Sequence, residues 1–193
     1  MSTLGFVGEV SPVRTDTELD AEAQARRRLA LAQIRQYPDP VLRMQAREVE
    51  EFDDDLLRLA ERMKALMSDA QGVGLAANQV GVLRRVFVYR PRDDEEARVL
   101  VNARIVERSG AQTDDEGCLS MQGIVVPVER ALDITVEARD ERGEPVRYEL
   151  TELPARVVQH ELDHLDGVLI LDRTTREARR EALATLRPRT ALG

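Results

Sequence analysis

The residues best suited to chemistry are His160, Glu161 and His164, which share the segment His160-Glu161-Leu162-Asp163-His164. Residues four apart lie on one face of a helix, so both imidazoles can reach a single metal ion. Glu161 lies about 100° further round the helix than His160, and a carboxylate there can reach a water molecule beside the ion. Two ligands next to a carboxylate are typical of a metal-dependent hydrolase. A chance match is the weaker interpretation, because the 2 histidines of the chain both fall in this segment.

The third ligand decides how such a site is used. A thermolysin-like zinc protease needs another histidine or glutamate further along, and no histidine follows His164. Cys118, the single cysteine, offers a thiolate, which is a strong ligand for zinc or ferrous iron. Its alternative role is that of a small buried apolar residue. Three protein ligands leave a position for water, so Cys118, His160 and His164 together indicate a catalytic site rather than a closed structural one.

A glycine-rich segment, Gly72 to Ala77, fits the dinucleotide-binding pattern G-x-G-x-x-A, with Asp93 about 20 residues further on. That pattern requires a strand before the glycines and a helix after them. Here a helical stripe precedes them and Gly81 soon follows, so we reject nucleotide binding. The segment is either a tight connection between helix and strand or an edge where an extended substrate approaches the backbone closely.

The elements that position these residues follow no regular βαβ alternation, which favours an α+β fold. Apolar residues at three- and four-residue spacing predict an amphipathic helix over 53–70. The helix that carries the histidines is predicted to begin near Pro154, because proline is favoured in a first turn, and to end around Gly167. A last helix is predicted from Thr174 to Leu186. Strands are predicted over 84–89, 99–106, 124–128, 134–138 and 146–150.

Composition places this 193-residue chain among ordinary globular proteins. Its net charge of −8 argues against a generalised nucleic-acid-binding protein, which would show a basic footprint. No run approaches the ~20 apolar residues that a membrane span needs, and no secretory signal is evident, so we expect a cytoplasmic protein. Residues 1–33 are predicted to form a polar arm, mobile or loosely docked, residues 34–173 the catalytic domain, and residues 174–193 a basic helix or tail.

Three segments in this order resemble the peptide deformylase family: Gly72 to Gln79, Glu116 to Ser120, and Gln159 to Gly167. The resemblance runs from Ile34 to Arg173. It implies antiparallel or mixed β-sheets packed around a central metal-binding helix, with a C-terminal helix. It also implies metal-dependent removal of the formyl group from the N-terminal formylmethionine of nascent polypeptides.

The resemblance further implies roles for particular residues. Glu161 would accept a proton from water and later pass one to the leaving amine. The Gln79 side-chain amide and the Leu119 backbone N–H would stabilise the negative oxygen of the transition state. The substrate-binding residues would be Val73, Gly74 and Val157, and structural support would come from Gly72, Glu116 and Arg130, with Glu116 paired to Arg130. Ordinary core packing is the alternative role of Val157, and a solvated loop position that of Gln79.

For the cofactor, the resemblance implies one divalent ion, ferrous iron first, with zinc, nickel or cobalt as alternatives that suit the same ligands. In some deformylases a basic C-terminal helix docks on the ribosome. The tail after Asp172 carries six arginines and two glutamates, so the same docking is one interpretation and a solvated helix face is the other. Gln122 and Ala103 stand where proline is common in the family, which bears on rate and substrate preference.

Two other functions stay open at this stage. A zinc endopeptidase shares the H-E-x-x-H pattern and would cleave internal peptide bonds, but Cys118 argues against it. A non-catalytic, metal-stabilised relative that binds the ribosome would need neither a general base nor an oxyanion donor. The presence of Glu161 and Gln79 argues against that function.

Overall fold

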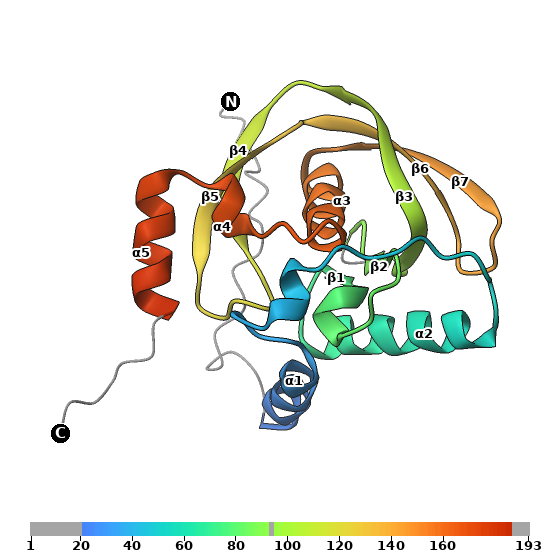
Figure 1. Cartoon of the computed structure of the whole chain (residues 1–193), viewed down its shortest axis with the longest axis horizontal. Helices are drawn as coiled ribbons and strands as arrows, with labels where there is room; N and C mark the ends of the chain where they lie inside the picture. Colours follow the sequence, from blue (N-terminus) through green and yellow to red (C-terminus); the bar gives the residue numbers. More distant parts are fainter. Residues whose placement is uncertain (1–20, 93–94, 187–193) are drawn as a thin grey trace, which may run out of the picture.

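The computed structural model describes residues 21–92 and 95–186. Its helices are α1 (Ala21–Gln33), α2 (Asp54–Asp69), α3 (Glu152–Leu165), α4 (Ile170–Arg173) and α5 (Arg176–Leu186), with 3-10 helices η2 (Pro40–Arg43) and η3 (Ala77–Val80). Its strands are β1 (Gly74–Ala76), β2 (Val86–Tyr89), β3 (Arg98–Ser109), β4 (Gln112–Gly117), β5 (Val125–Arg130), β6 (Asp133–Arg139) and β7 (Pro145–Thr151). All strands follow α2 and precede α3 in the chain, as Figure 1 shows.

The strands form a five-stranded sheet in the order β1-β2-β3-β6-β7 and a separate hairpin of β4 and β5. Every strand pair is antiparallel. Alternate residues point to opposite faces of a sheet, and here the two faces pack on different helices. Leu75 and Val88 pack in the core beside α2, whereas Ala76 and Phe87 pack in the core beside α3. This arrangement confirms the predicted α+β fold class (Figure 1).

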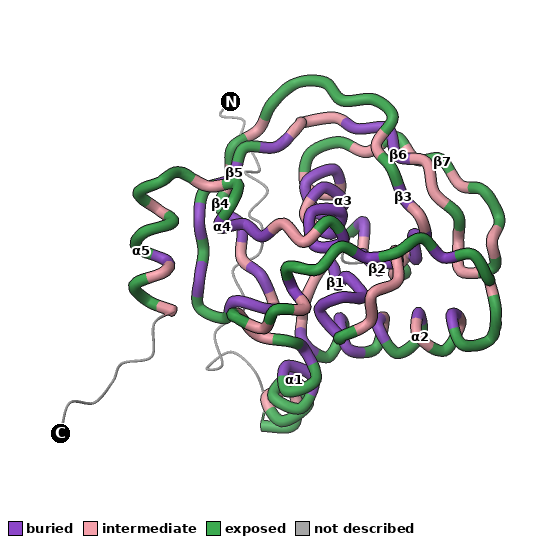
Figure 2. The backbone as a smooth tube through the Cα atoms, in the orientation of Figure 1, coloured by how far each residue is buried: buried purple, intermediate pink, exposed green. Residues whose placement is uncertain are grey.

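Helix α3 is buried almost along its whole length (Figure 2). One side packs on the sheet through residues such as Val158 and Leu165. A third core lies beneath α5, and it includes Ala182 of α5, Val126 and Val128 of β5, and Cys118. Since Cys118 comes from the hairpin and the histidines from α3, the fold brings two separate parts of the chain to one place.

The helix predictions agree with the structure to within a few residues. Helix α2 begins after Asp53, whose side chain accepts a hydrogen bond from the N–H of Leu56, as an N-cap does. Helix α3 begins at Glu152, which places Pro154 in its first turn. It ends at Leu165, and Gly167 then adopts a positive φ of 72°. A Cβ at Gly167 would lie 2.5 Å from the carbonyl oxygen of Arg43, so the turn after α3 requires glycine.

Residues 21–33, which are part of the predicted N-terminal arm, form α1, and Ala30 and Leu31 of this helix are buried in the core beside α2. Alanine, arginine and glutamine have high helix propensities, and the packing of Ala30 and Leu31 in the core adds to the stability of α1. The rest of the predicted arm, residues 1–20, lies outside the described residues, as does Asp93. Strands β1 and β4 are not among the predicted strands, and β1 begins within the glycine-rich segment, at Gly74.

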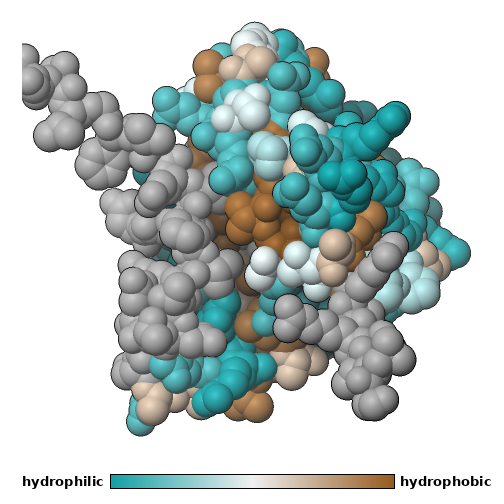
Figure 3. All heavy atoms as spheres, turned by 90° about the vertical axis from the view of Figure 1, so that its left-hand side faces the viewer, coloured by the Kyte–Doolittle hydropathy of each residue, from teal (hydrophilic) through white to brown (hydrophobic). Residues whose placement is uncertain are grey.

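Among the described helices, none has both the length and the apolar character that a membrane crossing requires. The face that carries α5 is mostly hydrophilic where its residues are described, with an apolar area near its middle (Figure 3).

Candidate metal centre

The segment from His160 to His164 lies in the C-terminal half of α3. The Nε2 atoms of the two histidines are 3.2 Å apart. Cys118 directly follows β4, and its Sγ lies 3.2 Å from the Nε2 of His164. One ligand atom from each of the three residues lies within 4.8 Å of the others.

These three side chains fit one divalent ion. Zinc lies about 2.0–2.3 Å from nitrogen and sulfur ligands, which sets neighbouring ligand atoms roughly 3–4 Å apart. Burial, above all, holds the pKa of His164 well below its ordinary value, which favours the neutral ring that a metal ligand requires. A thiolate with two imidazoles suits zinc or ferrous iron. With three protein ligands, a position for water stays open.

Glu116 fixes the orientation of His160. Its Oε2 lies 3.0 Å from the Nδ1 of His160, and Arg130 donates hydrogen bonds of 2.9 Å to both carboxylate oxygens. Burial opposes the charge on Glu116, but the hydrogen bonds from Arg130 and His160 outweigh it and hold the pKa of Glu116 below its ordinary value. An ionised carboxylate at Nδ1 leaves Nε2 for the metal, which is how the outer partners of metal-binding histidines act.

Two charged residues that help to hold Glu116 and Arg130 in place were not among the site residues predicted from the sequence. Arg156 is only 2% exposed, and its Nη1 donates to Glu116 at 2.7 Å and to the carbonyl of Val128 at 2.9 Å. Asp163 accepts hydrogen bonds from Arg130 at 2.5 Å and from Arg173 at 2.6 Å. Arg156 stands four residues before His160, on the same helical face, so its spacing was an available signal. Nothing in the sequence identifies the partners of Asp163.

Glu161 is buried beside these ligands, at 3% exposure, and its Oε2 has no hydrogen-bond partner within the described part of the chain. Burial raises the pKa of Glu161 to about 7. A carboxyl group with that pKa can both take up and release a proton near neutral pH. Gly74 of β1 lies against it, because a Cβ at Gly74 would be 2.3 Å from Oε1 of Glu161. Any side chain at position 74 would therefore displace the carboxylate.

Replacing Gly74 by alanine is expected to lower kcat by about 10²-fold, because small displacements of a reacting group cost that much, while the bound metal is retained. Gly117→Ala is the matched control: it lies beside Cys118, but a Cβ there meets nothing closer than 3.8 Å. Steady-state kinetics and metal content of both variants are the measurements. Equal activity in the two variants would show that the Gly74 contact does not position Glu161.

Gln79 lies in η3, directly after β1, and is buried. Its Oε1 accepts a hydrogen bond of 2.8 Å from the N–H of Ala76, and its Nε2 donates one of 3.0 Å to the hydroxyl of Ser120. The same Nε2 lies 3.7 Å from Sγ of Cys118. The N–H of Leu119, the residue after Cys118, makes no backbone hydrogen bond with the described residues. Both predicted donors therefore lie beside a metal ligand.

The predicted substrate-binding residues surround β1 and α3. Val73 precedes β1 and packs against the core cluster that contains Val157, which is itself 5% exposed. Gly72 lies against Leu119, since a Cβ at Gly72 would be 2.7 Å from Cδ1 of Leu119. In the described sheet β1 is an edge strand, so one side of its backbone can pair with an extended chain.

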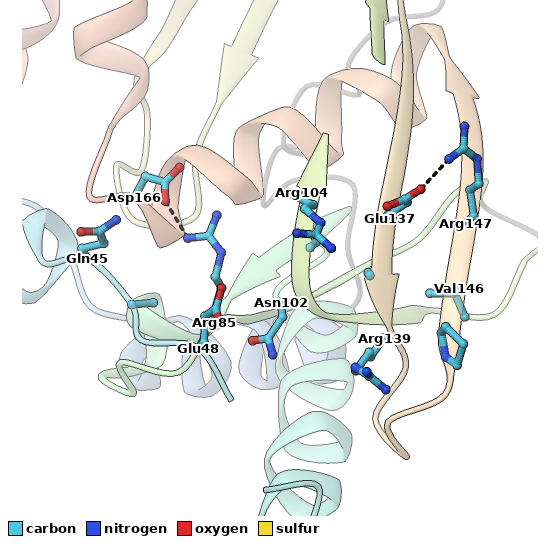
Figure 4. Close-up of a pocket in the computed structure, with 14 residues that line it drawn as sticks. Gln45, Glu48, Arg85, Asn102, Arg104, Glu137, Arg139, Val146, Arg147 and Asp166 are labelled. Carbon is cyan, nitrogen blue, oxygen red and sulfur yellow. Dashed lines mark hydrogen bonds and ion pairs between the residues drawn. The ribbon is translucent and has the colours of Figure 1, made fainter. Parts of the chain in front are cut away.

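A pocket of about 740 Å³ lies elsewhere, between residues 45–48 and strands β3, β6 and β7 (Figure 4). Two ion pairs lie along it, Arg85 with Asp166 and Arg147 with Glu137. None of the predicted site residues lines it, and a neighbouring pocket of about 520 Å³ contains only Arg130 among them. A pocket for a methionine side chain beside Val157 stays a prediction.

Comparison with known proteins gives consistent results. The family model described as polypeptide deformylase matches residues 31–180. A peptide deformylase of Clostridium botulinum is 46% identical over 149 residues, which span 77% of this chain and 100% of the relative. One from Acidothermus cellulolyticus is 45% identical over 159 residues, spanning 82% of this chain and 87% of that protein. The crystal structure of a peptide deformylase from Legionella pneumophila aligns with a TM-score of 0.75 at 41% identity, covering 78% of this chain and 90% of that one.

Proposed function

Because the chain belongs to the peptide deformylase family, we propose that it removes the N-formyl group from the formylmethionine of nascent polypeptides. The observation that carries this is the convergence of Cys118, His160 and His164 beside the buried carboxylate of Glu161. A divalent ion held by these three ligands supplies a Lewis acid, which polarises a carbonyl and lowers the pKa of water towards neutrality.

Glu161 moves the protons in this proposal. Its carboxylate accepts a proton from the attacking water and delivers one to the amine of methionine as the bond to the formyl carbon breaks. The pKa of about 7 that burial gives Glu161 suits both transfers. Its Oε2 makes no hydrogen bond with the described residues, so no hydrogen bond has to break before this oxygen accepts a proton.

Gln79 and Leu119 stabilise the negative charge that develops on the formyl oxygen. The amide orientation of Gln79 is fixed, since its oxygen is held by Ala76 and its nitrogen by Ser120. Donors that are held in place before the reaction need no reorganisation as charge develops, which makes them effective. The Leu119 N–H is the second donor, and Gly72 leaves room for the Leu119 side chain.

The free edge of β1 receives the backbone of the substrate, with Val73 and Gly74 along its path. Strand addition supplies backbone hydrogen bonds that do not depend on sequence, as a substrate class of many different nascent chains requires. The methionine side chain occupies apolar space at the margin of the core that contains Val157.

Ferrous iron is the proposed native ion, with zinc, nickel and cobalt as alternatives. We also propose a cytoplasmic location and docking of the C-terminal helix on the ribosome. In support, the apolar side of α5 packs in the third core, which leaves the arginines of its other side, Arg176 and Arg180, exposed. The further tail arginines, Arg187 and Arg189, lie outside the described residues.

The test is anaerobic turnover of formyl-Met-Ala-Ser by the chain loaded with ferrous iron, beside the zinc form. Formate release, with no cleavage of internal peptide bonds, is expected, and the iron form should be the faster. Cleavage between Met and Ala would favour a zinc endopeptidase. No formate with any ion, although one equivalent is bound, would contradict the proposed activity and favour a non-catalytic relative.

A further inference from the structure

Strand β7 forms the second edge of the five-stranded sheet. It pairs with β6 along its whole length, and no described strand lies on its other side (Figure 1). An unpaired edge offers a row of N–H and C=O groups to another strand. The residues of β7 therefore decide which strand can pair there.

The hydrogen bonds at both ends of the β6–β7 pair show which backbone groups face outward. Asp140 donates to the carbonyl of Glu144, and Glu152 donates to that of Leu132. Hydrogen-bonded pairs alternate along an antiparallel ladder. In the observed register, Val136 and Tyr148 then form a hydrogen-bonded pair, as do the pairs two residues away on either side, Ile134 with Leu150 and Ala138 with Val146. The N–H and C=O groups of Arg147, Glu149 and Thr151 consequently point away from β6.

The sequence of β7 is complementary to itself around Tyr148. If two copies pair antiparallel with Tyr148 facing Tyr148, each Arg147 faces Glu149 of the other copy. These are the residues whose backbone groups point outward, so they would exchange hydrogen bonds across the new pair. Val146 would face Leu150, extending the partly buried apolar layer to which both belong. We propose that β7 is a homodimer edge, at which two copies join their sheets about a twofold axis through Tyr148.

The charges on β7 have a simpler interpretation, the protection of an edge strand by charged residues and proline. Protection works when like charges would face each other, whereas self-pairing of β7 brings opposite charges together. Pro145 lacks an N–H, but it would lie opposite Thr151 of the other copy at the two ends of the ladder, so one bond would be lost at each end. Glu149 is exposed and makes no ion pair within the described chain, while Arg147 reaches Glu137 at 2.5 Å on its own sheet (Figure 4). Arg147 of a second copy would therefore supply the ion-pair partner that Glu149 lacks in the described chain.

A cysteine on the axis tests the geometry directly. Residues facing each other in a non-bonded antiparallel pair have Cα atoms about 4.5 Å apart, within the range of a disulfide. Tyr148→Cys should therefore form a covalent dimer rapidly under mild oxidation of the zinc-loaded protein. Val146→Cys is the matched control, because the two copies of residue 146 would lie roughly 13 Å apart along the strand.

Charge reversal tests the same pairing without oxidation, by sedimentation equilibrium over a concentration series. Glu149→Arg should weaken the dimer by about tenfold, because like charges would then face each other twice. The double variant Arg147→Glu with Glu149→Arg should restore dimerisation. The proposal is overturned if the unsubstituted chain stays monomeric and Tyr148→Cys crosslinks no faster than Val146→Cys. It is equally overturned if a dimer forms that the charge reversals do not change.

Discussion

Formate release by Glu161→Gln should fall by about 10²–10⁴-fold, the contribution typical of a positioned general acid–base group, while one equivalent of metal stays bound. Glutamine keeps the shape of the side chain but cannot accept a proton. The substitution should cost little stability, because Oε2 of Glu161 has no hydrogen-bond partner among the described residues. Activity and metal content measured on the same sample separate loss of the base from loss of the ion.

Glu129→Gln is the matched control, since it makes the same chemical change at an exposed position of β5. It should leave activity and metal content unchanged. If Glu161→Gln kept the activity of the unsubstituted chain, proton transfer by Glu161 would be excluded, although metal-dependent hydrolysis would not. If the variant lost its metal, Glu161 would be part of the ligand set.

Loss of a metal ligand is the second large effect we expect. In Cys118→Ala and His164→Ala the metal affinity should fall by more than about 100-fold, since even the outer partners of metal ligands are worth 10–100-fold. Formate release should disappear with the ion. Metal titration monitored by competition with a chromogenic chelator measures the affinity.

Thermal unfolding gives an independent readout of the same change. At an ion concentration of about 100 times Kd, binding stabilises the folded state by about 2.7 kcal/mol. Chelation should therefore lower the Tm of the unsubstituted chain but leave the Tm of Cys118→Ala unchanged. Each protein serves as its own control, so a general loss of stability from the substitution does not interfere. Cys118→Ala with full metal affinity would remove Cys118 from the proposed centre.

The part of the metal centre that lies on α3 could be predicted because it depends only on the spacing of residues within one helix. The spacing of His160 and His164 fixes their common face once the segment is helical. Cys118 could be added because it is the single cysteine. The pairing of Glu116 with Arg130, which the structure contains, came only from the resemblance to a family.

Other parts could not be predicted, because they depend on contacts between distant residues. Strand β4 has the polar sequence Gln112–Gly117 with only Glu116 buried, so it shows no apolar alternation and forms through its pairing with β5. Strand β1 is three residues long, too short for a pattern. Arg156 is a charge inside the core, which becomes understandable only once the position of Glu116 is known.

The contacts of the metal centre also set the order in which the protein becomes functional. Asn78 donates to the carbonyl of His164, 86 residues later, and Cys118 meets His164 across 46 residues. Such contacts close long loops, and the chain loses the conformational entropy of these loops before the contacts can stabilise the fold. During synthesis the ligand set is incomplete until α3 has left the ribosome, so ion capture belongs to the end of folding. A chain proposed to act on other proteins as they emerge must itself have emerged as far as α3 before it can begin.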